Sequence, residues 1–180
     1  MKPFTNVRAE DVENGRIAPV FAPKEQVLAY LHDMESQGRV HTLWPEHCLV
    51  GSWGWACPNQ LVQAVNTWDN RHHGQRPLHF YQKGEYPDAE MFSIFSYVNE
   101  ATPNKHGKLV LDQLAQYDEV VVCGFAKDYC VAESVKDLRN DSRFEGKLRF
   151  FEAGMAAIDP QSANLSIYKE CLNNFGAKCI

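Results

Sequence analysis

The sequence has few of the features that mark membrane and nucleic-acid-binding proteins. It contains no apolar run near the ~20 residues that a membrane span requires. Its 18 Lys and Arg are outnumbered by 23 Asp and Glu, so the formal net charge is −5. An acidic chain offers no broad basic surface to a nucleic acid or to an anionic lipid surface. We therefore expect neither a nucleic acid nor a membrane as a partner.

Signals for export and for a disulfide scaffold are lacking as well. The opening residues, MKPFTNVRAEDVENG, include no apolar stretch typical of a signal peptide, so we expect a cytoplasmic protein. Six cysteines in 180 residues are too few for a disulfide scaffold, and no two are spaced C-x-x-C. We expect reduced thiols, most of them buried. With 44% hydrophobic and 23% charged residues, the composition is that of an ordinary globular domain.

The order of hydrophobic patterns predicts an α/β fold. Residues 1–23 are rich in turn formers, and we expect an irregular lead-in arm there. Beyond it, residues 24–180 read as one domain in which helical and strand-like patterns alternate. The predicted helices cover 24–37, 58–72, 103–117, 129–141 and 161–175. The predicted strands cover 39–44, 78–82, 119–125, 147–153 and the final AKCI. The apolar run 119–125 is typical of a buried parallel strand.

The segment VVVCGFAKDYCVAESVKDL (120–138) holds the most chemical information. It predicts a strand that ends near Gly124, a tight turn, and a helix with Cys130 in its first turn. The positive end of a helix dipole and its free N–H groups favour a thiolate and can stabilise an oxyanion. The carboxyl end of a parallel strand is also where open α/β sheets bind ligands. Cys130 is therefore a candidate nucleophile, although simple packing against the sheet explains it equally well.

Three segments, in this order along the chain, resemble motifs of the isochorismatase-like cysteine hydrolases, and of nicotinamidases in particular. WPEHCLVGSWG (44–54) resembles the family's Trp-Pro-x-His-Cys motif. FYQKGEYPDAEMFSIF (80–95) resembles the strand with the catalytic lysine and the serine-containing aromatic segment after it. GFAKDYCVAESVKDL (124–138) resembles the nucleophile motif. The resemblance implies a three-layer, Rossmann-like α/β fold, with a mostly parallel sheet and helices on both faces.

The resemblance also implies roles for individual residues. Cys130 matches the nucleophile that forms a thioester with a small amide, and Lys83 matches the cation that stabilises the thiolate or the oxyanion. The Phe125–Ala126 bond matches a non-proline cis peptide, which would aim the N–H groups of Ala126 and Cys130 into an oxyanion hole. Aromatic residues that would wall the substrate pocket are Trp44, Trp53, Phe92, Phe95, Phe125 and Tyr129, although an ordinary core position explains any one of the first four better.

His47 matches a metal-binding histidine of the family, which implies zinc, manganese or iron. A histidine after Trp-Pro also suits a purely structural hydrogen bond. The family's second-strand Asp-x-His pair has no match here, because no D-x-H occurs in the chain. We therefore expect this polypeptide to bind a divalent metal only if the missing ligands are supplied.

The family's third catalytic residue, an aspartate base at the end of the first strand, has no match before Lys83. Asp11 follows no apolar strand, and Asp33 lies inside a predicted helix. Ala153-Gly154 also stands where family members often have Asp-Ala. Residues 1–23 resemble a linking segment that follows the first two strands in longer members. The N-terminal strands are thus expected to be missing, and three explanations stay open: a C-terminal piece of a longer protein, strands supplied by another chain, or a degenerate relative.

The function implied first is that of a nicotinamidase-like cysteine amidohydrolase with a small-molecule amide as its substrate. The alternative is a catalytically impaired pseudoenzyme, or a binding or scaffold protein of the same fold. An isochorismatase-like activity on a non-amide substrate is disfavoured, because that branch usually replaces the cysteine that is kept here as Cys130. Since oligomers are common in the family, we expect a homo-oligomer.

Overall fold

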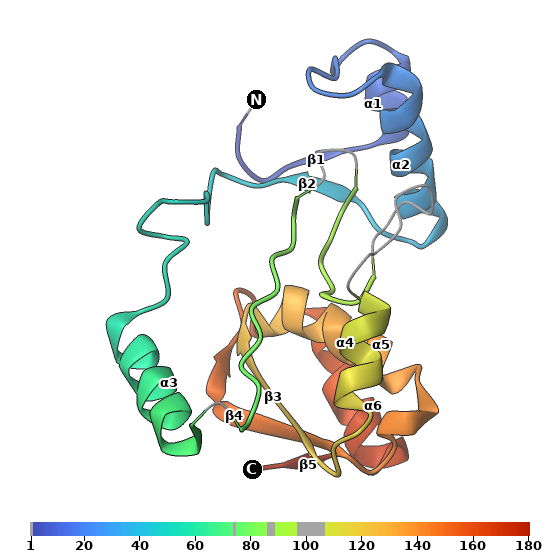
Figure 1. Ribbon diagram of the computed structural model, residues 1–180. Coiled ribbons are helices and arrows are strands. Elements are labelled where there is room, and N and C mark those ends of the chain that lie inside the picture. Colours follow the sequence, from blue (N-terminus) through green and yellow to red (C-terminus); the bar gives the residue numbers. More distant parts are fainter. Residues whose placement is uncertain (1, 74, 86–88, 97–106) are drawn as a thin grey trace. The chain divides into compact units, whose positions relative to one another are not determined.

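The computed structural model describes residues 2–73, 75–85, 89–96 and 107–180 (Figure 1). The chain forms two compact units, Met1–Gln82 and Lys83–Ile180. Each unit has buried apolar side chains of its own. Among the described residues, no helix reaches the length and apolarity that crossing a membrane requires.

In the first unit, a two-stranded antiparallel sheet lies beside two helices. β1 (Thr5–Val7) pairs with β2 (His41–Leu43), and the helices are α1 (Ala9–Glu13) and α2 (Lys24–Ser36). The expectation that residues 1–23 are irregular is wrong for β1 and α1, whereas residues 14–23 contain no helix or strand. Val7, Ala9 and Val12 are buried, and Glu35 on α2 accepts a hydrogen bond from the Ala9 N–H at 3.1 Å. Packing on α2 therefore orders the residues that lie between the turn formers Pro3 and Gly15.

Helix α2 and strand β2 confirm the predictions for 24–37 and 39–44. Leu31 and Met34 on α2 are each 1% exposed, as expected of its apolar face. Gly38 follows the helix with φ +70°, a conformation that glycine adopts without steric cost and that ends the helix. The Tyr30 hydroxyl lies 2.7 Å from His41 Nδ1 and ties the helix to the strand.

The remainder of the first unit follows the sequence prediction only in part. The helix predicted over 58–72 is present as α3 (Asn59–His72), but none of its residues is buried, and Leu61 is 52% exposed. The strand predicted over 78–82 is wrong, because these residues form no strand and Phe80 is 79% exposed. A strand needs a neighbour to pair with, and an alternating pattern cannot supply one.

The second unit contains a parallel sheet in the order β3-β4-β5 (Figure 1). Its strands are β3 (Val120–Phe125), β4 (Leu148–Ala156) and β5 (Lys178–Cys179). They confirm the strands predicted over 119–125, over 147–153 and at the C-terminus. Val122 pairs with Phe150 but Gly124 pairs with Met155, so β4 carries extra residues between these two pairs. This bulge lies beside the end of β3.

Three helices accompany this sheet: α4 (Gly107–Leu114), α5 (Ala132–Arg139) and α6 (Ser166–Asn174). They confirm the helices predicted in 129–141 and 161–175, whereas the first residues of the 103–117 prediction, 103–106, lie outside the described residues. Phe150 on β4 is fully buried, and its ring meets that of Tyr168 on α6 edge-on at 5.0 Å. Other apolar side chains with no exposure in this core are Ala132, Val135, Phe144, Leu148 and Cys171.

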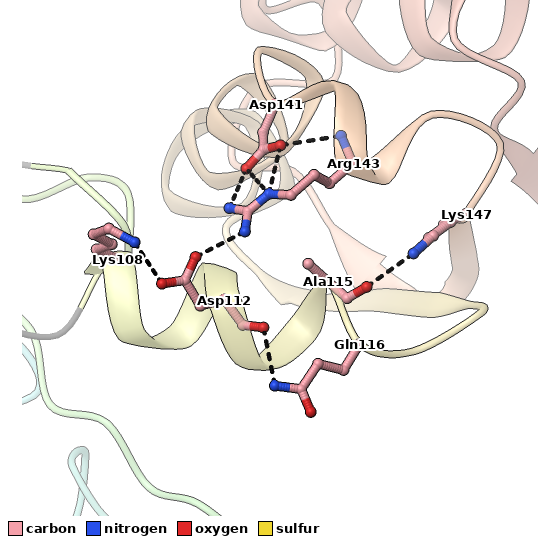
Figure 2. A network of polar contacts seen from close by, with 7 residues as sticks. All are labelled: Lys108, Asp112, Ala115, Gln116, Asp141, Arg143 and Lys147. Atoms are coloured by element: carbon pink, nitrogen blue, oxygen red, sulfur yellow. Dashed lines mark hydrogen bonds and ion pairs between the residues drawn. The ribbon is translucent and has the colours of Figure 1, made fainter.

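An ionic network ties α4 to the 3₁₀ turn Ser142–Phe144 (Figure 2). The Arg143 guanidinium lies 2.7 Å from an Asp112 oxygen and 2.5 Å from an Asp141 oxygen. The pKa of the Asp141 carboxyl is lowered, chiefly by its hydrogen bond with Arg143. The pKa of the Asp112 carboxyl is lowered as well, first by the hydrogen bond with Lys108 and then by that with Arg143.

Two expectations about burial are wrong. Strand β3 was expected to be buried, yet Val121 is 55% exposed and Phe125 is 74% exposed. Within the described residues β3 has β4 as its only neighbour, so it is an edge strand whose alternate side chains face away from the core. Most cysteines were expected to be buried, but Cys171 alone is. Cys130 is partly exposed and the other four are exposed, all six being free thiols.

Candidate active site

The candidate nucleophile lies where β3 passes into α5 (Figure 1). A cis peptide bond joins Phe125 and Ala126, in the configuration that the resemblance implies for this bond. A single π-helical turn, Lys127–Val131, follows and leads into α5. The Ala126 carbonyl accepts hydrogen bonds from the N–H groups of Tyr129 at 3.1 Å and Val131 at 3.2 Å. Cys130 is therefore fixed inside the first turn of the helical segment, as the sequence predicts.

The structure brings Lys83 and Cys130 together. The Lys83 ammonium lies 3.2 Å from the Cys130 sulfur, and it donates a second hydrogen bond to the Met91 carbonyl at 2.9 Å. Both residues are partly exposed. An ammonium at this distance can stabilise negative charge that develops nearby. The pairing of these two residues, which was inferred from separate motifs, is thus present in the described structure.

Sequence reasoning gave no role to Asp128, which the structure places at the centre of the turn. Its side chain is completely buried, and its two carboxylate oxygens accept hydrogen bonds from the N–H groups of Ile158 and Asp159, each at 2.9 Å. The Asp128 carbonyl also accepts a hydrogen bond from the Asn164 side chain at 3.0 Å. Asp128 thereby fastens the turn before Cys130 to the segment after β4. Its position two residues before the cysteine was the only signal in the sequence.

Of the aromatic residues predicted to line a pocket, one pair is brought together beside the nucleophile. The rings of Phe92 and Tyr129 lie 6.4 Å apart between their centroids, in a tilted arrangement. Phe95 is 8% exposed and belongs to the buried part of this unit, whereas Phe125 is largely exposed on β3. Phe95 is covered by protein, whereas Phe92 and Tyr129 are each partly exposed. The pocket as a whole stays a prediction.

The remaining predicted site residues, Trp44, His47 and Trp53, lie in the Met1–Gln82 unit. Trp44 packs edge-on against Phe4 at 5.7 Å and against His47 at 6.1 Å, while Trp53 is 93% exposed. His47 Nδ1 lies 2.7 Å from the Pro45 carbonyl, a local contact in which the ring N–H donates. These contacts give Trp44 and His47 a structural role within the first unit. Their part in a substrate pocket stays a prediction.

The described residues do not fit a metal site at His47. Among them, no group of three or more His, Cys, Asp or Glu side chains is arranged to hold a metal ion. One nitrogen of the His47 ring already contacts a backbone carbonyl, which leaves the other for a ligand role. Binding of zinc, manganese or iron with ligands supplied from elsewhere stays a prediction, and no chemical step is derived from it.

Comparisons with known proteins give matches by structure. A scan against protein-family models finds no match, and no curated protein sequence matches. The structure is similar to that of the yeast nicotinamidase Pnc1p, with a TM-score of 0.51 and 21% identity over 79% of this chain. It is similar to the nicotinamidase PncA from Bacillus subtilis, with a TM-score of 0.51 and 17% identity over 95% of this chain. The fold is that of the nicotinamidases.

A structure described as nicotinamidase/pyrazinamidase PncA from Bacillus subtilis is similar as well, with a TM-score of 0.50 and 16% identity over 88% of this chain. The match spans 86% of that chain, 78% of the other Bacillus subtilis chain and 60% of the yeast enzyme. The α/β fold with a parallel sheet, which the sequence predicts, is thereby shown. Identities this low show the nicotinamidase fold alone, so activity and substrate belong to the proposal below.

Proposed function

We propose that this protein is a cysteine hydrolase that cleaves the carbon–nitrogen bond of a small amide, with Cys130 as the nucleophile. The observation that carries the proposal is the 3.2 Å contact between the Lys83 ammonium and the Cys130 sulfur. A thiol held next to a cation at the start of a helical segment suits covalent catalysis, because the same positive field stabilises the oxyanion of the intermediate. The nicotinamidase fold supports an aromatic amide as the first substrate to test.

The proposed reaction has two stages. The Cys130 thiolate attacks the amide carbonyl carbon, and the carbonyl oxygen becomes an oxyanion near the Lys83 ammonium and the N–H groups of Ala126 and Cys130. The carbon–nitrogen bond then breaks, and the leaving amine takes up the proton that the thiol gave up, leaving a thioester on Cys130. A water molecule attacks this thioester, which releases the carboxylic acid and restores the thiol.

A second candidate function, a binding protein or pseudoenzyme of the same fold, is favoured by one observation. Among the described residues, the contacts of Lys83 and Cys130 include no carboxylate that could act as a base. Asp128, the nearest acidic residue along the chain, has both oxygens occupied by backbone N–H groups. Loss of a general base typically lowers a rate by ~10²–10⁴-fold. A protein without that base would bind the amide and turn it over slowly or not at all.

The test is ammonia release by the purified full chain from nicotinamide, pyrazinamide and benzamide. We expect hydrolysis of at least one of them, reduced to the buffer background by Cys130→Ala and lowered by about 10²–10³-fold by Lys83→Met, as for other groups that stabilise transition-state charge. Cys123→Ala is the matched control, because Cys123 is an exposed thiol on β3 close in sequence, and it should keep wild-type activity.

Intact-protein mass spectrometry after an acid quench should detect the acyl group on wild-type protein and not on Cys130→Ala. Binding of the amides without ammonia release or acylation would favour the pseudoenzyme. Hydrolysis that persists in Cys130→Ala would overturn the assignment of the nucleophile.

A further inference from the structure

The segment Met91–Ser96 lies within the second unit without being part of a helix or strand (Figure 1). Its side chains alternate between buried and more exposed, with Met91 at 5%, Ser93 at 3% and Phe95 at 8% exposure. Backbone of this kind has no ladder of its own and needs partners elsewhere to hold it in one place. Those partners are two polar side chains on α5.

Asp137 and Ser134, one turn apart on α5, hold the segment by its hydroxyls and its backbone. One Asp137 carboxylate oxygen, Oδ2, accepts hydrogen bonds from the hydroxyls of Ser93 and Ser96, both at 2.6 Å. The Ser134 hydroxyl accepts a hydrogen bond from the Ile94 N–H at 3.2 Å and donates one to the Cys130 carbonyl at 2.8 Å. We name the set Ser93, Ser96, Ser134 and Asp137 the serine clamp.

The clamp connects to the candidate catalytic pair through Met91. The Met91 carbonyl accepts the second hydrogen bond of the Lys83 ammonium at 2.9 Å, and the Gly84 N–H lies 3.3 Å from the Met91 sulfur. The place of the ammonium is therefore set on one side by this carbonyl and on the other by the Cys130 sulfur. A lysine side chain has four rotatable bonds and can adopt many conformations. Without the Met91 carbonyl in this place, the Lys83 ammonium would therefore not be held next to the thiol.

We propose, resting on the hydrolase function proposed above, that the serine clamp positions Lys83 against Cys130. Asp137 and Ser134 on α5 fix the segment 91–96 to the helix that directly follows the turn with Cys130, so one continuous helical segment holds both the carbonyl that orients the ammonium and the sulfur that receives it. Asp137 and Ser134 are positioning residues and not catalytic residues, since their contacts run through the segment and the helix backbone. The charge on Asp137 makes its two hydroxyl hydrogen bonds stronger than neutral ones.

The test measures the thiolate of Cys130 directly and does not require turnover. Alkylation of Cys130 by iodoacetamide is followed by peptide mass spectrometry at pH 6 and pH 9.5, and the ratio of the two rates reports how far the thiolate is favoured at low pH. We expect the ratio to fall by about tenfold in Asp137→Ala and in Ser134→Ala. Asp137→Asn and Ser134→Thr, which keep an acceptor at the same place, should restore most of it.

Asp112→Ala is the matched control, because it also removes a carboxylate from the second unit. The Asp112 carboxylate contacts Lys108 and Arg143 and not the segment 91–96. It should leave the ratio within twofold of wild type. If the serine clamp only stabilised the structure, its loss would change the alkylation rates at pH 6 and pH 9.5 by the same factor and leave their ratio unchanged. That result would overturn the proposal. So would an equal drop in Asp112→Ala. Absence of ammonia release from wild type, with the ratio responding as expected, would count against the hydrolase function alone.

Discussion

Cys130 and Lys83 are 47 residues apart in the sequence and meet at 3.2 Å, and each depends on a different support. Cys130 is fixed by the turn that Asp128 anchors with two backbone hydrogen bonds. Lys83 is fixed by the Met91 carbonyl. A thiol and an amine on flexible chains would lose conformational freedom on pairing. Holding both in advance means that little of this cost is left for the moment of reaction.

At the same scale, ionisation of the buried Cys171 thiol lowers the stability of the second unit at alkaline pH. Burial, aided by the nearby Glu170 charge, raises the pKa of its thiol to about 11 from the ordinary 9.0. A raised pKa in the folded state means that its contribution is complete below pH 9 and is lost as pH rises toward 11. We expect the urea midpoint of wild type to fall over this range, and to fall less in Cys171→Ala.

Tyr168 adds to this effect at still higher pH, because burial raises the pKa of its phenol as well. The control for the cysteine is Cys179→Ala, which removes an exposed thiol from β5. That variant should follow the wild-type midpoint at every pH. Parallel curves for wild type and Cys171→Ala between pH 8 and 11 would contradict the assignment.

At the scale of elements, α4 and the 3₁₀ turn after α5 are joined by a network of surface ion pairs. This network weakens at acidic pH. Arg143 keeps the pKa of the Asp141 carboxyl below its ordinary 3.8, and it helps Lys108 to lower that of Asp112. Lowered carboxyl pKa values mean that the contribution is present above about pH 4 and is lost as pH falls below it. Exposed pairs contribute little each, although several shared charges contribute more together.

We expect Arg143→Gln to lower the Tm at pH 7 by a small amount, and this difference from wild type to disappear by pH 2. Thermal unfolding followed by circular dichroism at pH 7, 5, 3 and 2 checks the expectation. Lys178→Gln, which removes an exposed lysine on β5, serves as the comparison and should show no such convergence. A difference for Arg143→Gln that is the same at pH 2 and pH 7 would show that the carboxylates are not its cause.

At the scale of the whole molecule, the predicted helices and strands differ in how much of their apolar surface is buried. Phe150 is completely buried beside Tyr168, whereas Leu61 on α3 is 52% exposed. Truncating a buried phenylalanine typically costs ~3–5 kcal/mol, and an exposed position changes stability by less than ~0.5 kcal/mol. We expect Phe150→Ala to lower the free energy of unfolding by about the first amount, and Leu61→Ala to leave it close to wild type.

Cys171 offers a readout confined to the second unit, because its side chain has no exposure in the folded state. The urea concentration at which Cys171 becomes open to alkylation should fall in Phe150→Ala and stay unchanged in Leu61→Ala. Equal shifts in both variants would mean that α3 supports the second core after all.

Local patterns in the sequence determined most of the secondary structure. The helical spacing of 24–37 and 161–175 places a hydrophobic stripe on one side of each helix, and the apolar run of 119–125 favours a strand. Neither signal depends on residues far away in the sequence. The glycine at position 38 ends α2 for an equally local reason. The pairing of Lys83 with Cys130 was inferred from a resemblance in three ordered motifs and from no spacing rule.

Tertiary structure alone decided which predicted elements formed and which side chains hold Cys130 and Lys83 in place. Residues 78–82 alternate as a strand does, yet they have no strand to pair with among the described residues. Strand β3 was predicted to be buried, yet its alternate side chains are exposed. Asp128, Ser134 and Asp137 act through partners more than 25 residues away. Contacts between distant residues follow from how the elements pack, and no local pattern encodes that packing.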